Sequence, residues 1–146
     1  MKMYFILNLP LAFITGLKIT EFEAAFSKVT IKFSYFTKNP FRSIYFACLA
    51  MAAELSSGSL AVYHTTNSNK KISMLVVGMQ ANFIKKAVGK ITFICNDGTL
   101  IENAIAKCIA NNTSESVVCK SLGFDESGET VAEFLITWSF KEKQSK

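Results

Sequence analysis

The sequence predicts an α+β fold in which a curved antiparallel sheet is wrapped around one long helix. Residues 44–62 leave no polar side over the first three turns, so a helix there must be enclosed on all sides. Much of the remaining chain alternates apolar and polar residues in long runs joined by short turns, which is typical of antiparallel strands. The chain has 146 residues, half of them hydrophobic, and we expect a single domain over 1–146.

Residues 1–15 predict a short apolar helix that packs on the domain or covers a channel, ending near Gly16. A signal peptide is the alternative, because Lys2 precedes an apolar run. Asn8 and Pro10 interrupt that run, and no small-residue cleavage pattern follows it.

The first strands are expected on either side of residue 25. Residues 17–23 form one, and an alternating run forms the other, with Val29, Ile31, Phe33 and Tyr35 on one face. The segment TKNP then ends the pairing with a turn.

The central helix is predicted over residues 43–62, with Ser43 as its N-cap. Glu54 is the one charged residue in this otherwise apolar stretch. A membrane span is the alternative for such a segment, but a carboxylate near its centre would be costly in lipid, and SSGS follows soon after. We therefore expect no stable membrane insertion.

The second half of the chain predicts four more strands and one helix. Residues 72–83 form a long strand with Gly78 as a bulge, and a hairpin turn at 87–89 leads to a return strand. Residues 99–110 have the 3 and 4 spacing of an amphipathic helix. Strands 115–124 and 129–141 are joined by DESG, and residues 141–146 are expected to be a flexible tail.

Composition excludes several classes of function. The net charge is +5, but the lysines are scattered and form no dense stripe, so nucleic acid is not an expected partner. Four cysteines form no CxxC pair and only one histidine is present, so no metal site is expected. Thiols in apolar runs favour a reducing compartment, and we expect the cytoplasm.

Several motifs together resemble the hotdog-fold thioesterase superfamily, and most closely a bacterial family near the PaaI-like thioesterases. The matching segments cover nearly the whole chain: Gly16 with Leu17 (imperfectly), NPFRSIY at 39–45, AAE at 52–54, FIKKAVGK at 83–90 and TWSF at 137–140.

The resemblance implies hydrolysis of an acyl thioester of coenzyme A or of acyl carrier protein, with no cofactor beyond the thioester substrate. Glu54 matches the helix-borne carboxylate that acts as general base or nucleophile. Asn39 and the backbone amides of Tyr45 and Phe46 match the groups that polarise the carbonyl. Candidate contacts to coenzyme A are the basic residues Arg42, Lys85, Lys86 and Lys90, whose alternative role is as ordinary solvated side chains.

The predicted helix separates these two sets of groups. Glu54 would lie about ten residues into the helix, about 15 Å from its first turn at 1.5 Å per residue. One chain could not bring both to one carbonyl, so we expect a homodimer, or a tetramer built from such dimers, with each site shared between two subunits.

Two departures from the family pattern leave a binding role open. Ile44, Tyr45 and Phe46 stand where many relatives have His-Gly-Gly, and the segment SMLVVGMQ is mostly apolar where some relatives hold the water with Ser or Thr. A non-catalytic hotdog dimer that binds acyl chains or coenzyme A is therefore the alternative. A hotdog dehydratase normally needs a histidine near the active site, and His64, the only histidine, lies at the helix end. The sequence does not predict the acyl group.

Overall fold

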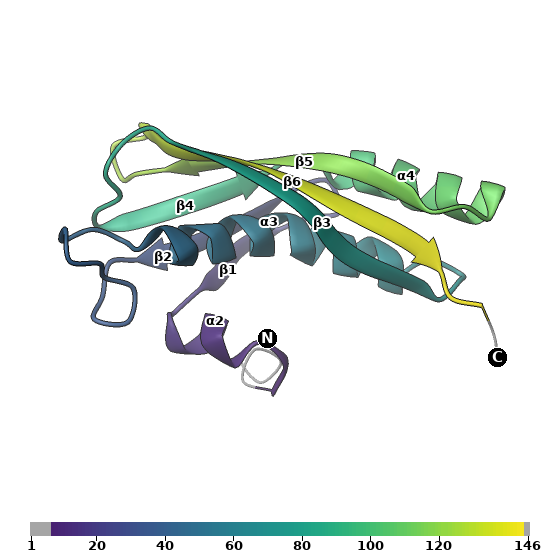
Figure 1. The fold of residues 1–146 in the computed structure, drawn as a ribbon, viewed down its shortest axis with the longest axis horizontal. Helices are drawn as coiled ribbons and strands as arrows, with labels where there is room; N and C mark the ends of the chain where they lie inside the picture. Colours follow the sequence, from purple (N-terminus) through teal and green to yellow (C-terminus); the bar gives the residue numbers. More distant parts are fainter. Residues whose placement is uncertain (1–6, 145–146) are drawn as a thin grey trace.

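Six antiparallel strands form one sheet that curves around a central helix (Figure 1). This computed structural model describes residues 7–144. The strands are β1 (Lys18–Phe22), β2 (Ser27–Lys32), β3 (Ile72–Phe83), β4 (Lys90–Cys95), β5 (Glu115–Phe124) and β6 (Thr130–Glu142), in the spatial order β1-β2-β4-β5-β6-β3.

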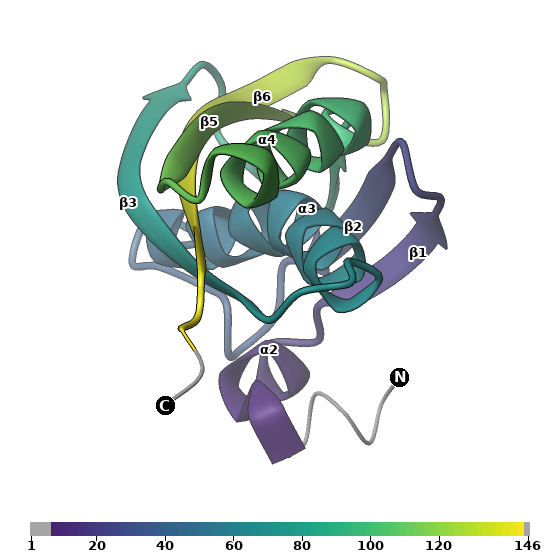
Figure 2. The ribbon, with the colours of Figure 1, turned by 90° about the vertical axis from the view of Figure 1, so that its right-hand side faces the viewer.

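The central helix α3 (Phe46–Thr66) lies inside the curve of the sheet, which arches over it from β1 to β3 (Figure 2). The helix packs most closely on β2, β4, β5 and the helix α4 (Gly98–Asn111). It is the one described helix that is long and apolar enough to span a membrane, and 56% of its most apolar window is buried inside the domain. It is therefore the core helix of the fold, as its composition predicted.

The start of α3 differs from the prediction. Tyr45, in an extended conformation, occupies the N-cap position and provides no side-chain cap. Ser43 is not the cap, because its hydroxyl and its backbone amide are both hydrogen-bonded to the side chain of Asn39. The helix continues to Thr66, one turn further than expected.

The pairing of β3 also differs from the prediction. A hairpin between β3 and β4 is wrong, because β3 pairs with β6 and β4 pairs with β2 and β5. The amides of Ile84 and Lys85 both donate to the carbonyl of Val131, so the chain leaves β3 beside β6 and crosses the end of the sheet before β4 begins. The bulge at Gly78 is confirmed by a register shift between Val76 and Gly78.

The hairpin of β5 and β6 is confirmed over nearly its predicted length. The tail is shorter than expected, because Lys141 and Glu142 pair with β3 and the Lys143 amide donates to the carbonyl of Lys71. Residues 145 and 146 lie outside the described residues.

The first strand pair is confirmed, but β2 ends earlier than its alternating pattern indicated. Val29 and Ile31 are fully buried, whereas Phe33 and Tyr35 lie beyond the strand and are exposed. The side chain of Thr37 explains the break, since it accepts from the Ser34 amide and donates to the carbonyl of Lys32, which turns the chain out of the sheet.

The N-terminal segment contains a short helix α2 (Pro10–Ile14) on the side of α3 that the sheet leaves open (Figure 2). The predicted helix over 1–15 extends into residues 1–6, which are outside the described residues. Ala12 and Leu17 are buried, so this segment is packed against the domain.

Candidate functional site

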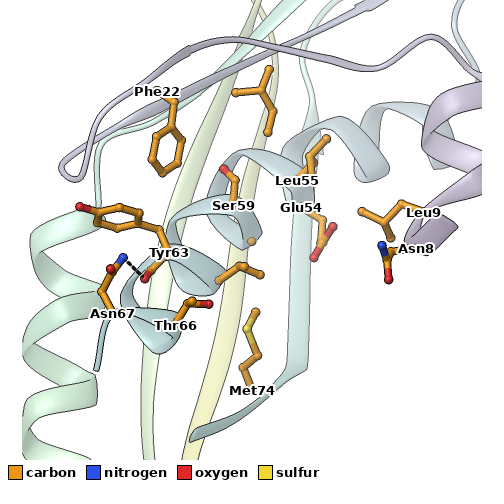
Figure 3. Close-up of a pocket in the computed structure, with 13 residues that line it drawn as sticks. Asn8, Leu9, Phe22, Glu54, Leu55, Ser59, Tyr63, Thr66, Asn67 and Met74 are labelled. Carbon is orange, nitrogen blue, oxygen red and sulfur yellow. Dashed lines mark hydrogen bonds between the residues drawn. The ribbon is translucent and has the colours of Figure 1, made fainter. Parts of the chain in front are cut away.

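Glu54 lies in the third turn of α3 with its carboxylate at the edge of an apolar groove (Figure 3). Burial raises the pKa of this carboxyl above its ordinary value. Among residues 7–144 no Lys or Arg forms an ion pair with it that would lower the pKa again. A carboxylate with a raised pKa is a stronger base than an exposed one, which suits it to accept a proton during a reaction.

The groove beside Glu54, called here the α3 groove, has a volume of about 510 Å³. Glu54 and Leu9 lie at one end, Tyr63 and Asn67 at the other, with Phe22 and Met74 on opposite sides (Figure 3). The complete lining, as far as the described residues go, is Asn8, Leu9, Ile19, Phe22, Glu54, Leu55, Gly58, Ser59, Val62, Tyr63, Thr66, Asn67 and Met74.

Gly58 is one turn beyond Glu54 on the same face of the helix. A methyl group on Gly58 would lie 2.8 Å from Glu54 Oε1 and 3.2 Å from Trp138 Cζ2. Any side chain at this position would therefore force the carboxylate to move. Sequence reasoning missed Gly58, although a glycine four residues after a lone acid in a helix, where glycine is unfavourable, was the available signal.

The N-terminus of α3 offers a different pair of amide donors from the pair that the sequence predicted. The Tyr45 amide donates to the carbonyl of Thr37 at 2.8 Å, so it is already used. Cys48 and Leu49 are the first residues of the helix to donate back, both to the carbonyl of Tyr45. Phe46 and Ala47 lie before that point, and their amides have no helical carbonyl to bond. Of the two predicted donors, the structure therefore leaves Phe46 available and adds Ala47.

Asn39 is occupied within its own loop. Its Oδ1 accepts from the amides of Phe41 and Ser43, and its Nδ2 donates to the hydroxyl of Ser43 at 2.9 Å. These bonds hold the turn that leads into α3. In this conformation Asn39 shapes the approach to the helix and does not present a free amide to a ligand.

Of the four predicted basic residues, Lys85 and Lys86 line one cavity, whereas Arg42 and Lys90 lie apart from it. Lys85 pairs with Asp125 at 2.7 Å and with Glu129 in the β5–β6 turn, and these carboxylates raise the pKa of the lysine. Lys90 precedes the buried Ile91 on β4, so it lies on the face of the sheet away from α3. Lys86 is exposed beside the helix N-terminus.

Arg42 is exposed and has a left-handed backbone conformation, with φ of 58°. It lines a separate cavity of about 430 Å³ with Phe33, Lys38, Asn39 and Pro40. A role in the turn before α3 accounts for the exposure and backbone conformation of Arg42 without a bound ligand.

Apart from Arg42 and Lys90, the candidate residues are therefore divided between two places. Asn39, Tyr45, Phe46, Lys85 and Lys86 surround a cavity of about 400 Å³ at the start of α3. Glu54 instead lines the α3 groove, eight residues along the helix and about 12 Å from its first residue at 1.5 Å per residue.

The cysteines and the histidine, the remaining reactive side chains, are packed inside the domain. All four cysteines are buried and free, and His64 is buried with its Nε2 2.9 Å from the carbonyl of Ala24. Among the described residues no group of three or more His, Cys, Asp or Glu could hold a metal ion.

A long helix held in the curve of an antiparallel sheet defines a hotdog fold, and solved structures share it over nearly the whole chain. A protein of unknown function from Pseudomonas aeruginosa, described as a probable thioesterase, has a TM-score of 0.81 at 19% identity, covering 97% of this chain and 94% of that one. A protein of unknown function from Chlorobaculum tepidum has a TM-score of 0.82 at 15% identity, covering 97% and 92%. A thioesterase from Haemophilus influenzae has a TM-score of 0.68 at 12% identity, covering 96% and 88%.

The chain belongs to the family DUF4442, described as a domain of unknown function, whose model matches residues 1–140. Among curated proteins, none is similar enough to count as a match. The structural likeness therefore establishes the fold, and function is argued from the site.

Proposed function

We propose that this protein is a thioester hydrolase in which Glu54 activates water. The observation that carries the proposal is the half-buried carboxylate of Glu54, whose pKa is raised by an apolar groove large enough for a ligand. Similarity in fold to proteins described as thioesterases supports the same reaction class. An acyl group carried on coenzyme A or on acyl carrier protein is the proposed substrate.

In the proposed reaction, Glu54 takes a proton from water while the hydroxide oxygen bonds to the thioester carbonyl carbon. The carbonyl oxygen becomes an oxyanion, which backbone N–H groups at a helix N-terminus stabilise. The carbon–sulfur bond then breaks, and the leaving thiolate takes the proton from Glu54. One thioester and one water give one carboxylic acid and one thiol.

The amide donors must come from a second subunit in this scheme. Phe46 and Ala47 of the same chain are two turns of helix away from Glu54, which is too far for one carbonyl to contact both. In an isologous dimer whose two α3 helices run past each other, the partner subunit's Phe46 can approach Glu54, and two equivalent sites result.

The free edge of β3 supports such a dimer. Within the described residues β3 has a neighbour, β6, on one side only, although it is 12 residues long. Long apolar edge strands are open to pairing with another chain. Leu75, Val77, Met79 and Phe83 on this strand are all exposed, as is Phe46 nearby, which contacts the ring of Phe83.

A binding protein for acyl thioesters is the second candidate, and the surroundings of Glu54 favour it. Met74 from β3 lines the groove, and the edge of Trp138 from β6 lies beside Gly58. Neither side chain could hold the attacking water by a hydrogen bond at that position, since the Trp138 N–H already donates to Ser57. A binding protein and a hydrolase would make the same contacts to the acyl thioester, and only the hydrolase would also hold the attacking water.

The experiment that separates the two candidates is release of free thiol from a panel of short, long and aryl acyl-CoAs, with wild type and Glu54→Gln. Both proteins are first shown to be folded and in the same oligomeric state. Hydrolysis through Glu54 predicts a loss on the order of 10² or more in kcat/KM for Glu54→Gln. Turnover that is equal in the two proteins would remove Glu54 from the mechanism, and no turnover in wild type would favour the binding role.

A further inference from the structure

We propose that the α3 groove binds the acyl chain of the substrate and that it fits an unbranched chain of about 12 to 14 carbons. This inference rests on the proposed function for the position of the thioester, which is placed at Glu54. The groove itself is argued from its shape and its lining.

The floor of the groove is one stripe of the central helix. Glu54, Gly58, Val62 and Thr66 all line it and are spaced four residues apart, so successive members lie one above the other in a row that winds gradually around α3. After the carboxylate of Glu54, the row continues with Gly58, which has no side chain, then with the small apolar Val62 and the small polar Thr66. A chain that starts at Glu54 can therefore lie along the helix without meeting a bulky residue.

The walls are apolar on both sides. Ile19 and Phe22 come from β1, with Phe22 held edge-on against Tyr63 at a centroid distance of 5.5 Å, and Met74 comes from β3. Among the described lining residues Glu54 is the one carboxylate, and there is no Lys or Arg. Such walls suit methylene groups, and the described lining offers no cation to pair with an acidic chain.

The length of the stripe sets the expected chain length. From Glu54 to Thr66 the helix advances about 18 Å at 1.5 Å per residue. Carbon–carbon bonds of about 1.5 Å advance an extended chain by about 1.3 Å each, so about 14 carbons reach from the carboxylate to Thr66. Thr66 and Asn67 mark the polar end.

Binding is tested without hydrolysis by calorimetry with two thioethers, S-dodecyl-pantetheine and S-ethyl-pantetheine. Pantetheine is shared by coenzyme A and acyl carrier protein, and a thioether cannot be hydrolysed. The blocking variant is Val62→Trp, because Val62 is 42% exposed on the groove floor. The matched control is Val118→Trp on β5, which is 51% exposed and lies outside the groove lining.

We expect wild type and Val118→Trp to bind the dodecyl compound at least tenfold more tightly than the ethyl compound, and Val62→Trp to lose that preference. If Val62→Trp does not fold, Thr66→Trp at the far end of the floor takes its place and should weaken binding of the dodecyl compound while leaving binding of the ethyl compound unchanged.

The two proposals fail in different ways. The proposal that the α3 groove binds the acyl chain is overturned if wild type binds the dodecyl and ethyl compounds equally, or if a folded Val62→Trp keeps the dodecyl preference. Either result counts against the groove even if short acyl-CoAs are hydrolysed. The other case is that wild type prefers the dodecyl compound, loses that preference in Val62→Trp, and hydrolyses no thioester. That result would support binding of the acyl chain in the α3 groove and overturn the proposal that the protein is a hydrolase.

Discussion

At the scale of single residues, Glu54 and Gly58 form the core of the candidate site. The carboxylate of Glu54 is half-buried and its pKa is raised. It occupies space that is open because Gly58 has no side chain. Glu54 could be picked out from the sequence because a lone acid in an apolar helix is unusual. Gly58 gave a weaker signal, a glycine inside a helix, and its contact with Trp138 of β6 is formed only in the folded sheet.

Glu54→Gln is expected to be at least as stable as wild type at about pH 8. Burial raises the pKa of Glu54, so the folded protein holds the proton more tightly than the unfolded chain does. Ionisation therefore costs stability once the pH rises above the ordinary value of about 4.3, and the cost is complete above the raised folded-state pKa. Gln carries no charge and avoids that cost.

Thermal unfolding of both proteins from about pH 4 to about pH 8 measures this difference. The difference in stability between the two proteins should be small at about pH 4 and should grow in favour of Glu54→Gln as the pH rises. A variant that is less stable than wild type at about pH 8 would indicate that the ionised carboxylate stabilises the fold or the dimer, which is the structural alternative to a catalytic role.

Gly58→Ala is expected to lower kcat by about tenfold to a hundredfold while the protein stays folded. The new methyl group displaces Glu54 Oε1, which would lie only 2.8 Å from it. Displacement toward solvent lessens the effect of burial, so the acidic limb of the pH–rate profile should move to lower pH.

Gly78→Ala, once shown to keep the oligomeric state of wild type, is the control for Gly58→Ala, because its methyl group would make only an ordinary contact, 3.6 Å from Thr137 Oγ1. Stability of Gly58→Ala should stay within about 1 kcal/mol of wild type, since the gain in helix propensity offsets the contact with Trp138. An unchanged pH profile would show that Gly58 does not position the carboxylate.

At the scale of the elements, local sequence predicted which segments are helices and strands better than it predicted how they pair. The alternation in 115–124 and 129–141 indicated β5 and β6 correctly because a tight turn joins them. The partner of β3 was predicted wrongly because residues 84–89 contain turn-forming residues but cross the end of the sheet. The start of α3 was misplaced because Ser43 is bonded to Asn39 instead of capping the helix.

Val77→Lys on the β3 edge is expected to convert the proposed dimer into monomers. Val77 is 55% exposed near the middle of this strand, and an isologous edge pairing would bring it close to its own copy. Two lysines facing each other across the edge repel, and a charged edge strand resists pairing. Analytical ultracentrifugation of Val77→Lys beside Val118→Lys, a matched exposed valine on β5, measures the effect. Dissociation of both variants, or of neither, would place the interface elsewhere.

At the scale of the whole molecule, the sequence indicated a site shared between subunits, and this remains a proposal. The candidate residues occupy two cavities on one chain, one at the start of α3 and one beside Glu54. The resemblance placed Asn39 and Tyr45 among the polarising groups, but their hydrogen bonds could only be seen in three dimensions. Phe46 and Ala47 remain as donors, and each would serve the partner's Glu54.

The shared site can be tested by removing one component from each subunit. Phe46→Pro deletes the amide donor at the first helical position, where proline is tolerated, and the extended backbone of Tyr45 suits a following proline. Phe46→Ala is its control, because it removes the same ring and keeps the N–H. Phe46→Pro should therefore be much less active than Phe46→Ala on acyl thioesters.

The decisive measurement is thiol release after Glu54→Gln and Phe46→Pro dimers are unfolded together and refolded as a mixture. Half of randomly mixed dimers would be heterodimers, each with one intact site, so about a quarter of the wild-type activity should return from two nearly inactive parents. No recovery, in mixtures shown to contain heterodimers, would contradict a site that combines Glu54 of one subunit with the helix N-terminus of the other.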